Sequence, residues 1–433
     1  MSDNTTSEHA TSDRKPSDKK SEKKTTSMTA RARAAIGKAT GMKPLQPGKQ
    51  AYGYVSTGSF SVDMLIGGTR TLDGKALICP GFPRRKITEV YGAESSGKTT
   101  LLISAMVQAQ RAGGSALFLD FEHSIDLTYA QKIGLSLDED KMTIYQPDTM
   151  EEGFGALYLG IMAGYDIIGI DSVAAMVPAA ELAKGFNDPA RIGAVAAKFS
   201  RELPKFASWL NKYPILPNPD KEKKVRDPNH PGSALVFLNQ VRAVISTGGY
   251  GGGGGEQEST TGGKALKYFA YERLALSKFK SEVVERLDPM TGKKRRYQYG
   301  NVTTVKVAKS KIDAKQGHST QIFIRYGTGI DDYFSIIETG VVYKLIRKDS
   351  SFYTFADARF KGRDALRKYL IDNPTVYDTL RVKLAQLVNA GAVVAEEPEE
   401  DELASFEPGE DEDDVDLEAS AEAMAEEVIA EDA

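Results

Sequence analysis

The sequence predicts an α/β protein in which helices cover a mainly parallel central sheet. Between about residues 50 and 330, short apolar runs of strand composition alternate with helical segments. Of the 433 residues, 41% are hydrophobic, which is enough to fill a substantial core. Residues 331–394 predict a small, helix-rich C-terminal α/β domain with a hairpin near 343–355. The two termini are predicted to be disordered.

Hydrophobic periodicity places the main elements of the core. Short runs rich in apolar and β-branched residues predict strands at 86–91, 116–120, 166–171 and 234–239. Helical spacing predicts helices at 99–111, which two glycines end, and at 192–212. Within the second helix, the spacing predicts that Trp209 is a core residue.

Two stretches interrupt this alternation. Residues 214–231 are charged and rich in proline, and residues 247–263 are so rich in glycine that they are expected to be mobile without a ligand. Both are predicted to be surface loops. The four histidines of the chain are scattered and it has one cysteine, so the sequence predicts no metal cluster built from histidines.

Charge is distributed unevenly along the chain. Residues 395–433 contain 19 Asp and Glu and no Lys or Arg, leaving 56 basic against 41 acidic residues in the rest. A basic body with an acidic tail indicates a polyanionic partner and a tail that competes with it. The alternative is that the tail only aids solubility.

The N-terminal region is polar and predicts little folded structure. Residues 1–27 have almost no large apolar side chains, which predicts disorder. Residues 28–50 include a short basic helical pattern, either an arm that docks on a neighbouring subunit, as a polymerisation element, or a solvated helix. With no secretory signal, no run of about 18 apolar residues and Cys79 as the sole cysteine, we expect a cytoplasmic protein without a membrane partner.

A phosphate-binding motif follows the first predicted strand and opens the first predicted helix. The sequence GAESSGKT matches G-x-x-x-x-G-K-[ST], in which backbone N–H groups and a lysine bind phosphates and the hydroxyl binds Mg²⁺. ATP and Mg²⁺ are therefore the expected cofactors. The residues predicted to bind ATP here are Gly92, Ala93, Glu94, Ser95, Ser96, Gly97, Lys98, Thr99 and Thr100.

Two carboxylates are expected to complete this site. Asp171 ends an apolar strand and is predicted to hold Mg²⁺ through water, beside the Thr99 hydroxyl that ligates it. The phosphate-binding motif, or P-loop, opens a helix, and Glu122 follows the strand after that helix. There it is either a general base that activates water or a solvated loop acid. The neighbouring His123 is expected to pack or form hydrogen bonds rather than bind metal.

The residues between about 56 and 355 resemble the bacterial RecA recombinase family. The resemblance lies in segments that occur in the family's order, among them GFPRRKITEVYGAESSGKTTL, LFLDFEHSIDLTYAQKIGL, LVFLNQVRAVI and TTGGKALKYFAYERLAL. It implies a RecA-like P-loop ATPase core at 51–330 that carries two DNA-binding loops. It also implies an ATP-dependent recombinase that forms helical filaments on single-stranded DNA and exchanges strands with homologous duplex DNA.

The resemblance assigns roles at the nucleotide site. Glu122 becomes the catalytic base beside Lys98, and Gln240 senses the γ-phosphate and relays it to the following loop. Asp126 and Tyr129 would hold the adenine. Two further lysines would reach the nucleotide of the adjacent subunit, unless they are only an exposed basic strand edge. They are Lys309 and Lys311.

The same resemblance implies two DNA-binding loops, at about 184–193 and from 241 to about 261. Basic residues would neutralise phosphates, an apolar side chain would wedge between bases, and glycine would allow close backbone approach. The residues expected to contact DNA are Arg191, Ile192, Gly193, Arg242, Ile245, Gly262 and Gly263.

The chain also departs from the family pattern. Ala93 replaces the usual P-loop proline, residues 71–80 and 214–231 resemble insertions, and the first 50 residues match poorly. These departures indicate a divergent member, for which a viral source is one interpretation. The alternatives are a ring-forming P-loop DNA helicase and an ATP-dependent DNA-binding scaffold without strand exchange.

Overall fold

The computed structural model describes most of the chain between residues 53 and 389. The described ranges are 53–67, 81–184, 193–212, 230–242, 263–288, 290–311 and 316–389, with short strand pieces at 69–72, 75–78, 215–216, 225–226 and 259–260 and six positions between 28 and 39. The predicted tails at 1–27 and 395–433 lie outside these residues. Their predicted disorder and the domain boundaries therefore stay predictions.

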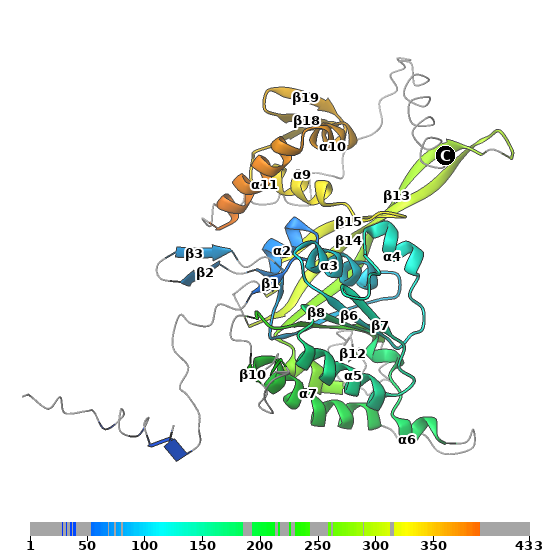
Figure 1. Cartoon of the computed structure of the whole chain (residues 1–433). Coiled ribbons are helices and arrows are strands. Elements are labelled where there is room, and N and C mark those ends of the chain that lie inside the picture. Colours follow the sequence, from blue (N-terminus) through cyan, green and yellow to red (C-terminus); the bar gives the residue numbers. More distant parts are fainter. Residues whose placement is uncertain are drawn as a thin grey trace, which may run out of the picture.

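A ten-stranded sheet forms the centre of the molecule (Figure 1). Its strands are β5 (Ile87–Gly92), β6 (Ala116–Asp120), β7 (Met142–Tyr145), β8 (Ile167–Asp171), β11 (Ala234–Arg242), β12 (Ser259–Thr260), β13 (Glu272–Leu287), β14 (Lys294–Ser310), β15 (Ser319–Arg325) and β16 (Gly329–Ile330). Their order is β16-β15-β14-β13-β5-β11-β8-β6-β7, with β12 paired to β11. The six strands from β13 to β7 run parallel, which confirms the predicted fold class.

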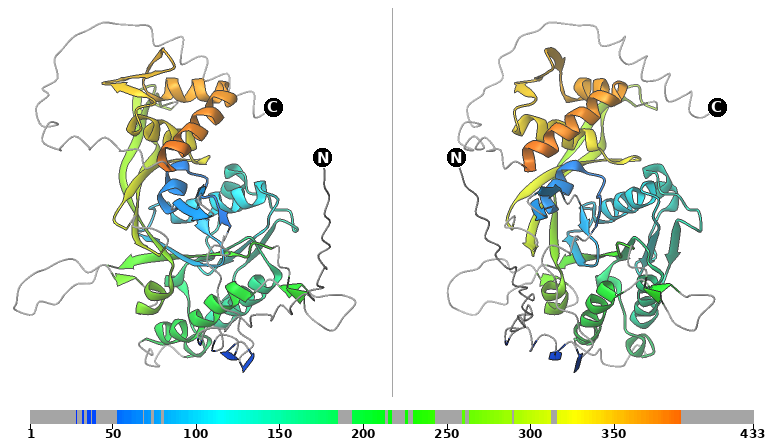
Figure 2. Two further views of the ribbon diagram at one scale, coloured as in Figure 1. Left: turned by 90° about the vertical axis from the view of Figure 1, so that its left-hand side faces the viewer. Right: turned by 60° about the vertical axis from the view of Figure 1, so that its left-hand side comes forward.

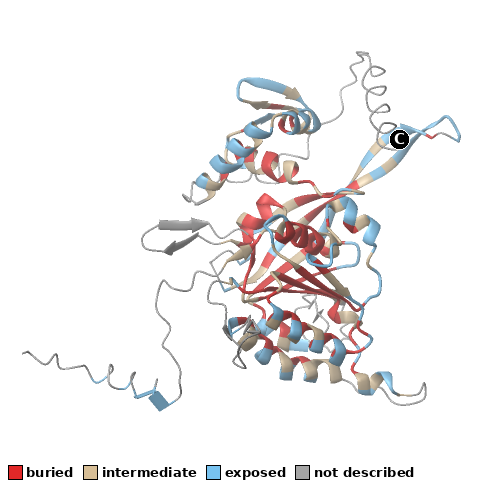
Figure 3. Ribbon diagram, viewed as in Figure 1, coloured by how far each residue is buried: buried red, intermediate tan, exposed pale blue. Residues whose placement is uncertain are grey.

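Helices cover both faces of this sheet, which Figure 3 shows as its most buried layer. On one face lie α2 (Phe60–Ile66), α3 (Lys98–Arg111) and α4 (Leu127–Ile133), and on the other lie α5 (Met150–Ala163), α7 (Ala194–Lys212) and α8 (Gly263–Phe269). Alternate residues of a strand supply the two layers. Phe118 of β6 packs in the cluster that contains α3, and Leu117 and Leu119 pack in the cluster that contains α5 and α7.

Trp209 lies at the edge of this second cluster. Its ring is half-buried, 4.0 Å from the ring of Tyr158 and 5.6 Å from that of Phe206 between centroids. The helical spacing therefore identified a packing residue, although not a fully buried one.

Short strand pairs lie outside the main sheet. They are β1 (Tyr54–Val55) with β4 (Phe82–Pro83), β2 (Thr69–Leu72) with β3 (Lys75–Ile78), and β9 (Ile215–Leu216) with β10 (Val225–Arg226). Within the stretch at 71–80, residues 71–72 and 75–78 therefore belong to an antiparallel strand pair. The Pro-rich stretch at 214–231, expected to be a loop, contains a pair of antiparallel strand pieces.

The C-terminal part of the described chain has its own small core. It comprises α9 (Asp332–Val342), β17 (Arg347–Asp349), β18 (Phe352–Phe355), β19 (Ala358–Lys361), α10 (Arg363–Asp372) and α11 (Pro374–Asn389). Where a hairpin was expected near 343–355, three strands form a sheet. Asp332 joins this part to α2, because its carboxylate accepts a hydrogen bond from the backbone N–H of Phe60 at 2.5 Å. None of the described helices is long and apolar enough to cross a membrane.

The middle of the sheet contains a buried ion pair. Arg273 Nε on β13 lies 2.5 Å from Glu89 Oε2 on β5, and the Glu89 side chain is fully buried. Asn239 Nδ2 on β11 donates to the other oxygen of Glu89 at 2.9 Å. Side chains therefore join the three neighbouring strands β13, β5 and β11, in addition to their backbone hydrogen bonds.

Replacing one partner of this pair is expected to destabilise the fold strongly. Arg273→Gln leaves the Glu89 carboxylate buried without its cation, which should lower the free energy of unfolding by about 3–5 kcal/mol. Denaturant unfolding measures the change. The double variant Glu89→Gln with Arg273→Gln, which leaves no unpaired charge, should lose less. A single variant as stable as the parent would contradict this account.

Candidate active site

The P-loop connects β5 to α3, as the sequence predicted. Gly97 precedes the helix with a φ of 91°, in the left-handed region where glycine is favoured. Close packing against backbone also requires Gly92, and a side chain at Gly97 would displace Ile324. A Cβ on Gly92 would lie 2.2 Å from the carbonyl oxygen of Leu276, and one on Gly97 would lie 2.1 Å from Ile324 Cδ1. The loop leads directly into the N-terminus of α3. Its backbone N–H groups therefore lie where they can bind phosphate oxygens.

Lys98 is held inside the loop. Its Nζ donates hydrogen bonds to the carbonyl oxygens of Ala93 at 2.7 Å and Gly92 at 3.2 Å. Burial lowers the pKa of the Lys98 ammonium, an effect that the charges of Asp171 and Glu122 oppose. The cation is thus partly desolvated and positioned where phosphate oxygens could replace the two carbonyls.

Thr99 and Asp171 bring a hydroxyl and a carboxylate together beside Lys98. Thr99 Oγ1 donates to Asp171 Oδ2 at 2.6 Å. Burial raises the pKa of the Asp171 carboxyl to about 6, although the Thr99 hydrogen bond opposes the change. A hydroxyl and one carboxylate fit Mg²⁺, which usually takes few protein ligands and completes its shell with water and phosphate. Across the described ranges, no three His, Cys, Asp or Glu residues form a dedicated metal cage.

Glu122 lies beyond β6, next to the ends of β8 and β11. Its Oε1 accepts hydrogen bonds from the Ser172 hydroxyl and from Gln240 Nε2, the latter at 3.0 Å. These three residues meet because their strands are neighbours and their carboxyl ends lie at one edge of the sheet. Ser172 was not predicted. Its only signal is that it follows Asp171, and the order of the strands cannot be read from the sequence.

The residues predicted to hold the adenine lie next to the P-loop helix. Asp126 begins α4, where its side chain accepts a hydrogen bond from the backbone N–H of Tyr129 at 3.0 Å. The Tyr129 hydroxyl is 3.4 Å from Thr100 Oγ1. His123 is exposed, and its Nε2 lies 3.9 Å from Asp148 Oδ1.

The two lysines predicted to reach the nucleotide of an adjacent subunit contact the end of α8 within their own subunit. Lys309 Nζ donates to the carbonyl oxygens of Lys267, Tyr268 and Ala270 at 2.7, 3.0 and 2.8 Å. Lys311 Nζ lies 3.5 Å from the carbonyl oxygen of Tyr268. Lysines commonly satisfy the free carbonyls at a helix C-terminus in this way. Partial burial, with the charge of Lys311 nearby, lowers the pKa of the Lys309 ammonium.

Most of the predicted DNA-contacting residues lie outside the described part of the chain. Four of them are in the gaps: Arg191, Ile192, Ile245 and Gly262. Arg242 ends β11, Gly193 precedes α7 and Gly263 opens α8. A Cβ on Gly263 would lie 2.8 Å from the Cβ of Ala196. Helices α7 and α8 cover the same face of the sheet, so the C-terminal ends of both predicted loops lie on that face.

The fold and this site define a P-loop nucleotide-binding protein. The comparisons narrow the class further, because the RecA N-terminal domain model matches residues 34–217 and 222–331. The RecA protein of Nocardia farcinica is 34% identical over 379 residues, covering 87% of this chain and 95% of that protein. RecA of Mycolicibacterium smegmatis is 33% identical and covers 84% and 91%. The chain belongs to the RecA family.

Membership in this family confirms the predicted resemblance and makes the chain an ATP-dependent DNA recombinase. RecA of Acidothermus cellulolyticus is 34% identical over 364 residues, with 84% of this chain and 92% of that protein covered. The crystal structure of the RadB recombinase aligns with a TM-score of 0.41 and 19% identity, covering 64% of this chain and 99% of that one. The helicase and scaffold alternatives are not favoured.

Proposed function

We propose that the chain assembles on single-stranded DNA with ATP, hydrolyses the ATP, and couples this cycle to strand exchange with homologous duplex. One observation carries the proposal. Gln240, whose amide contacts the Glu122 carboxylate, lies on β11, and the same strand continues through Arg242 into the predicted second DNA loop. A single strand thus connects the candidate base with the candidate DNA contact.

Hydrolysis would use groups already positioned in the site. Lys98 would bind the outer phosphates, and Thr99 and Asp171 would hold Mg²⁺, which supplies positive charge against the phosphates. Glu122 would accept a proton from the attacking water. Ser172 and Gln240 fix the orientation of its carboxylate. If the Gln240 amide turned toward the γ-phosphate, Glu122 would lose one donor and β11 would transmit the change to the loop.

Other nucleotide contacts follow from the resemblance. Asp126 and Tyr129 would bind the adenine, consistent with their place beside Thr100. Lys309 and Lys311 would turn from the end of α8 to the nucleotide of an adjacent subunit. Their Nζ atoms would then contact phosphate oxygens in place of backbone carbonyls. Because these phosphates belong to another subunit, the ATP site would be complete only between two copies of the chain.

We also propose that the protein works in the cytoplasm.

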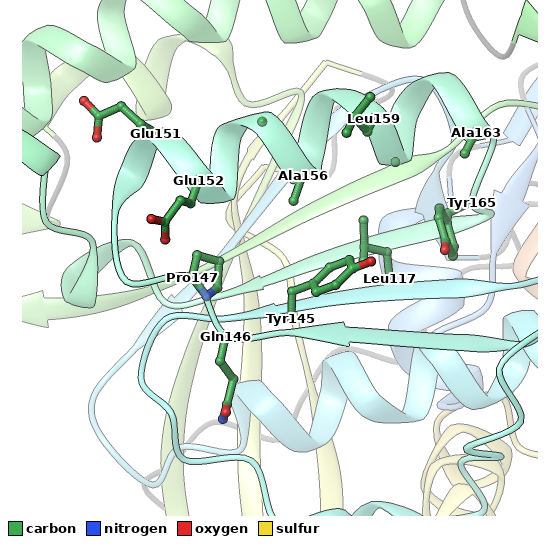
Figure 4. A pocket seen from close by; sticks show the side chains of 12 residues that line it. Leu117, Tyr145, Gln146, Pro147, Glu151, Glu152, Ala156, Leu159, Ala163 and Tyr165 are labelled. Carbon is green, nitrogen blue, oxygen red and sulfur yellow. The ribbon is translucent and has the colours of Figure 1, made fainter.

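An open groove beside the sheet edge supports self-association. Edge strand β7 and helix α5 border a hollow of about 640 Å³ that Tyr145 and Tyr165 line (Figure 4), and the Tyr165 hydroxyl lies 2.8 Å from Thr143 Oγ1 on β7. The Leu159 side chain on α5 is 63% exposed, and Tyr145 is 55% exposed. An unpaired edge strand next to exposed apolar side chains favours a partner that covers both. We propose that the basic arm at 28–50 of a second copy covers them, near Glu151 and Glu152.

A pairing assay tests the proposed function. The chain should pair a single strand with homologous duplex when ATP is present, without requiring free ends. Electron microscopy with single-stranded DNA and a slowly hydrolysed ATP analogue should show helical filaments. Directional unwinding that needs no homology, together with closed rings, would instead identify a helicase. DNA binding with neither pairing nor hydrolysis would identify a scaffold.

Removing the acidic tail is expected to strengthen duplex binding. Nineteen carboxylates tethered to a basic body compete with DNA for the same cations, and salt or Mg²⁺ weakens that competition. Duplex affinity of a chain ending at residue 394 should therefore rise most at low salt. A tail of full length with Asn and Gln replacing its acids should behave like the deletion. An unchanged affinity at low salt would refute the competition.

A further inference from the structure

Strands β13 and β14 extend beyond the sheet as a two-stranded ribbon. Strand β5 pairs with β13 only as far as Leu276, and β15 pairs with β14 only from Gly300 onward. Between residues 283 and 298 the two strands pair only with each other, through five residue pairs that end at Leu287 and Lys294. At about 3.4 Å per residue, these pairs form a projection of about 17 Å, visible in Figures 1 and 2. We call residues 283–298 the ribbon tip.

The ribbon tip is strongly basic. It contains five Lys and Arg and two acids. The acids each pair with one arginine, since Arg296 Nε lies 3.2 Å from Glu285 Oε1 and a terminal nitrogen of Arg295 lies 3.7 Å from Asp288 Oδ2. Within the described ranges, no acid lies within ion-pair distance of the other three cations. They are Arg286, Lys293 and Lys294, all of them exposed.

The cross-strand register places like charges face to face. Arg286 pairs directly with Arg295, and like charges in opposite positions of an antiparallel pair destabilise it. The tip also exposes Leu287 by 66% and Met290 by 95%. A two-stranded hairpin alone is at best marginally stable in water. An anion that lies across the two strands would remove the repulsion and cover the tip.

The root of the ribbon is braced by the small C-terminal core. Arg363 on α10 lies 3.7 Å from Glu282 Oε1 on β13, and its guanidinium is 4.5 Å from the ring centre of Phe334 on α9. Tyr299 on β14 packs edge-on against Phe323 on β15, with ring centres 5.6 Å apart, and Phe323 in turn lies 5.9 Å from Phe334 on α9. These contacts hold the root of the ribbon in place. The ribbon therefore loses less conformational entropy when its tip binds a partner.

The ribbon leaves the sheet away from the predicted DNA loops. Helices α7 and α8, which begin where those loops end, lie at the opposite end of the molecule in Figure 1 and in both views of Figure 2. Strand exchange requires two DNA molecules to be held at once. The major groove of B-DNA is about 12 Å wide and admits a two-stranded β-ribbon.

We propose that the ribbon tip is a separate contact for duplex DNA. Arg286, Lys293 and Lys294 neutralise backbone phosphates, without selecting a base sequence, while the two loops hold the single strand. The proposal rests on the proposed function because it assigns the second DNA molecule its own surface. Duplex binding by the free protein needs neither ATP nor homology, so its test gives a result even if strand exchange fails.

The test compares the full-length parent with two triple variants. The first removes three charges, by Arg286→Gln, Lys293→Gln and Lys294→Gln. The second keeps them, by Arg286→Lys, Lys293→Arg and Lys294→Arg. Binding of a fluorescent duplex of unrelated sequence is measured between low and moderate salt, alongside single-stranded DNA affinity and DNA-stimulated ATP hydrolysis.

The charge-removing variant should bind duplex about 10- to 100-fold more weakly, and the slope of log affinity against log salt should fall by about 2 to 3. Its single-strand affinity and hydrolysis should match the parent, and the charge-conserving variant should match the parent throughout. Unchanged duplex affinity overturns the proposal. So does an equal loss of duplex and single-strand binding. If the loss disappears in a chain ending at residue 394, the tip binds the acidic tail instead of DNA, and the proposal is also wrong.

Discussion

The Lys98→Ala variant should hydrolyse ATP at least a hundredfold to a thousandfold more slowly than the parent, which in practice abolishes activity. The Lys98 ammonium is partly buried and held by the loop carbonyls of Gly92 and Ala93. No other described cation makes a hydrogen bond to these two carbonyls. Removing one preorganised group that stabilises transition-state charge typically costs this much. Phosphate release in the presence of single-stranded DNA measures the loss.

The fold should survive this substitution. Burial lowers the pKa of Lys98, so the folded state disfavours its charged form relative to water. Thermal unfolding without nucleotide should therefore differ little between Lys98→Ala and the parent. Lys132→Ala, at an exposed position of α4, is the matched control and should hydrolyse ATP normally. A Lys98→Ala rate within threefold of the parent would show that this loop is not the catalytic phosphate site.

The P-loop and its flanking elements could be predicted because their information is local. Strand β6 occupies the predicted residues 116–120, and α3 begins one residue before the predicted start at Thr99. A strand, a glycine-rich turn and a helix follow one another within 30 residues. Their periodicity and turn chemistry are therefore sufficient to place them.

The contacts of Glu122 could not be predicted in the same way. Ser172 and Gln240 are 50 and 118 residues distant in the chain, and they meet Glu122 only because β8 lies between β6 and β11. That order depends on how the whole sheet packs. Lys309 and Lys311 illustrate the same limit, because pattern alone could not show that they bind the end of α8.

Two departures from the expected fold have local physical causes. The ribbon tip was not expected, because residues 283–298 lack the alternating apolar face that predicts a half-buried strand. The turn between β18 and β19 uses Ala356 and Asp357 at φ of 47° and 63°, where a hairpin normally has Asn or Gly. Without that turn signal, the third strand of the small sheet was missed.

Glu122→Gln should lower the rate of ATP hydrolysis by about 10²- to 10⁴-fold, the usual contribution of a general base. ATP affinity should stay near that of the parent, because Lys98, Thr99 and Asp171 are unchanged. Steady-state kinetics with single-stranded DNA separates kcat from KM, and binding of a fluorescent nucleotide confirms occupancy.

The substitution is informative because it preserves the local contacts. A glutamine at 122 still offers a carbonyl oxygen to the Ser172 hydroxyl and to Gln240 Nε2, so the geometry around the side chain is retained while the basic group is lost. Glu139→Gln, at an exposed loop position, is the matched control. Wild-type hydrolysis by Glu122→Gln would remove Glu122 as the base. Slow hydrolysis with unchanged filament formation would show that assembly needs ATP binding but not its hydrolysis.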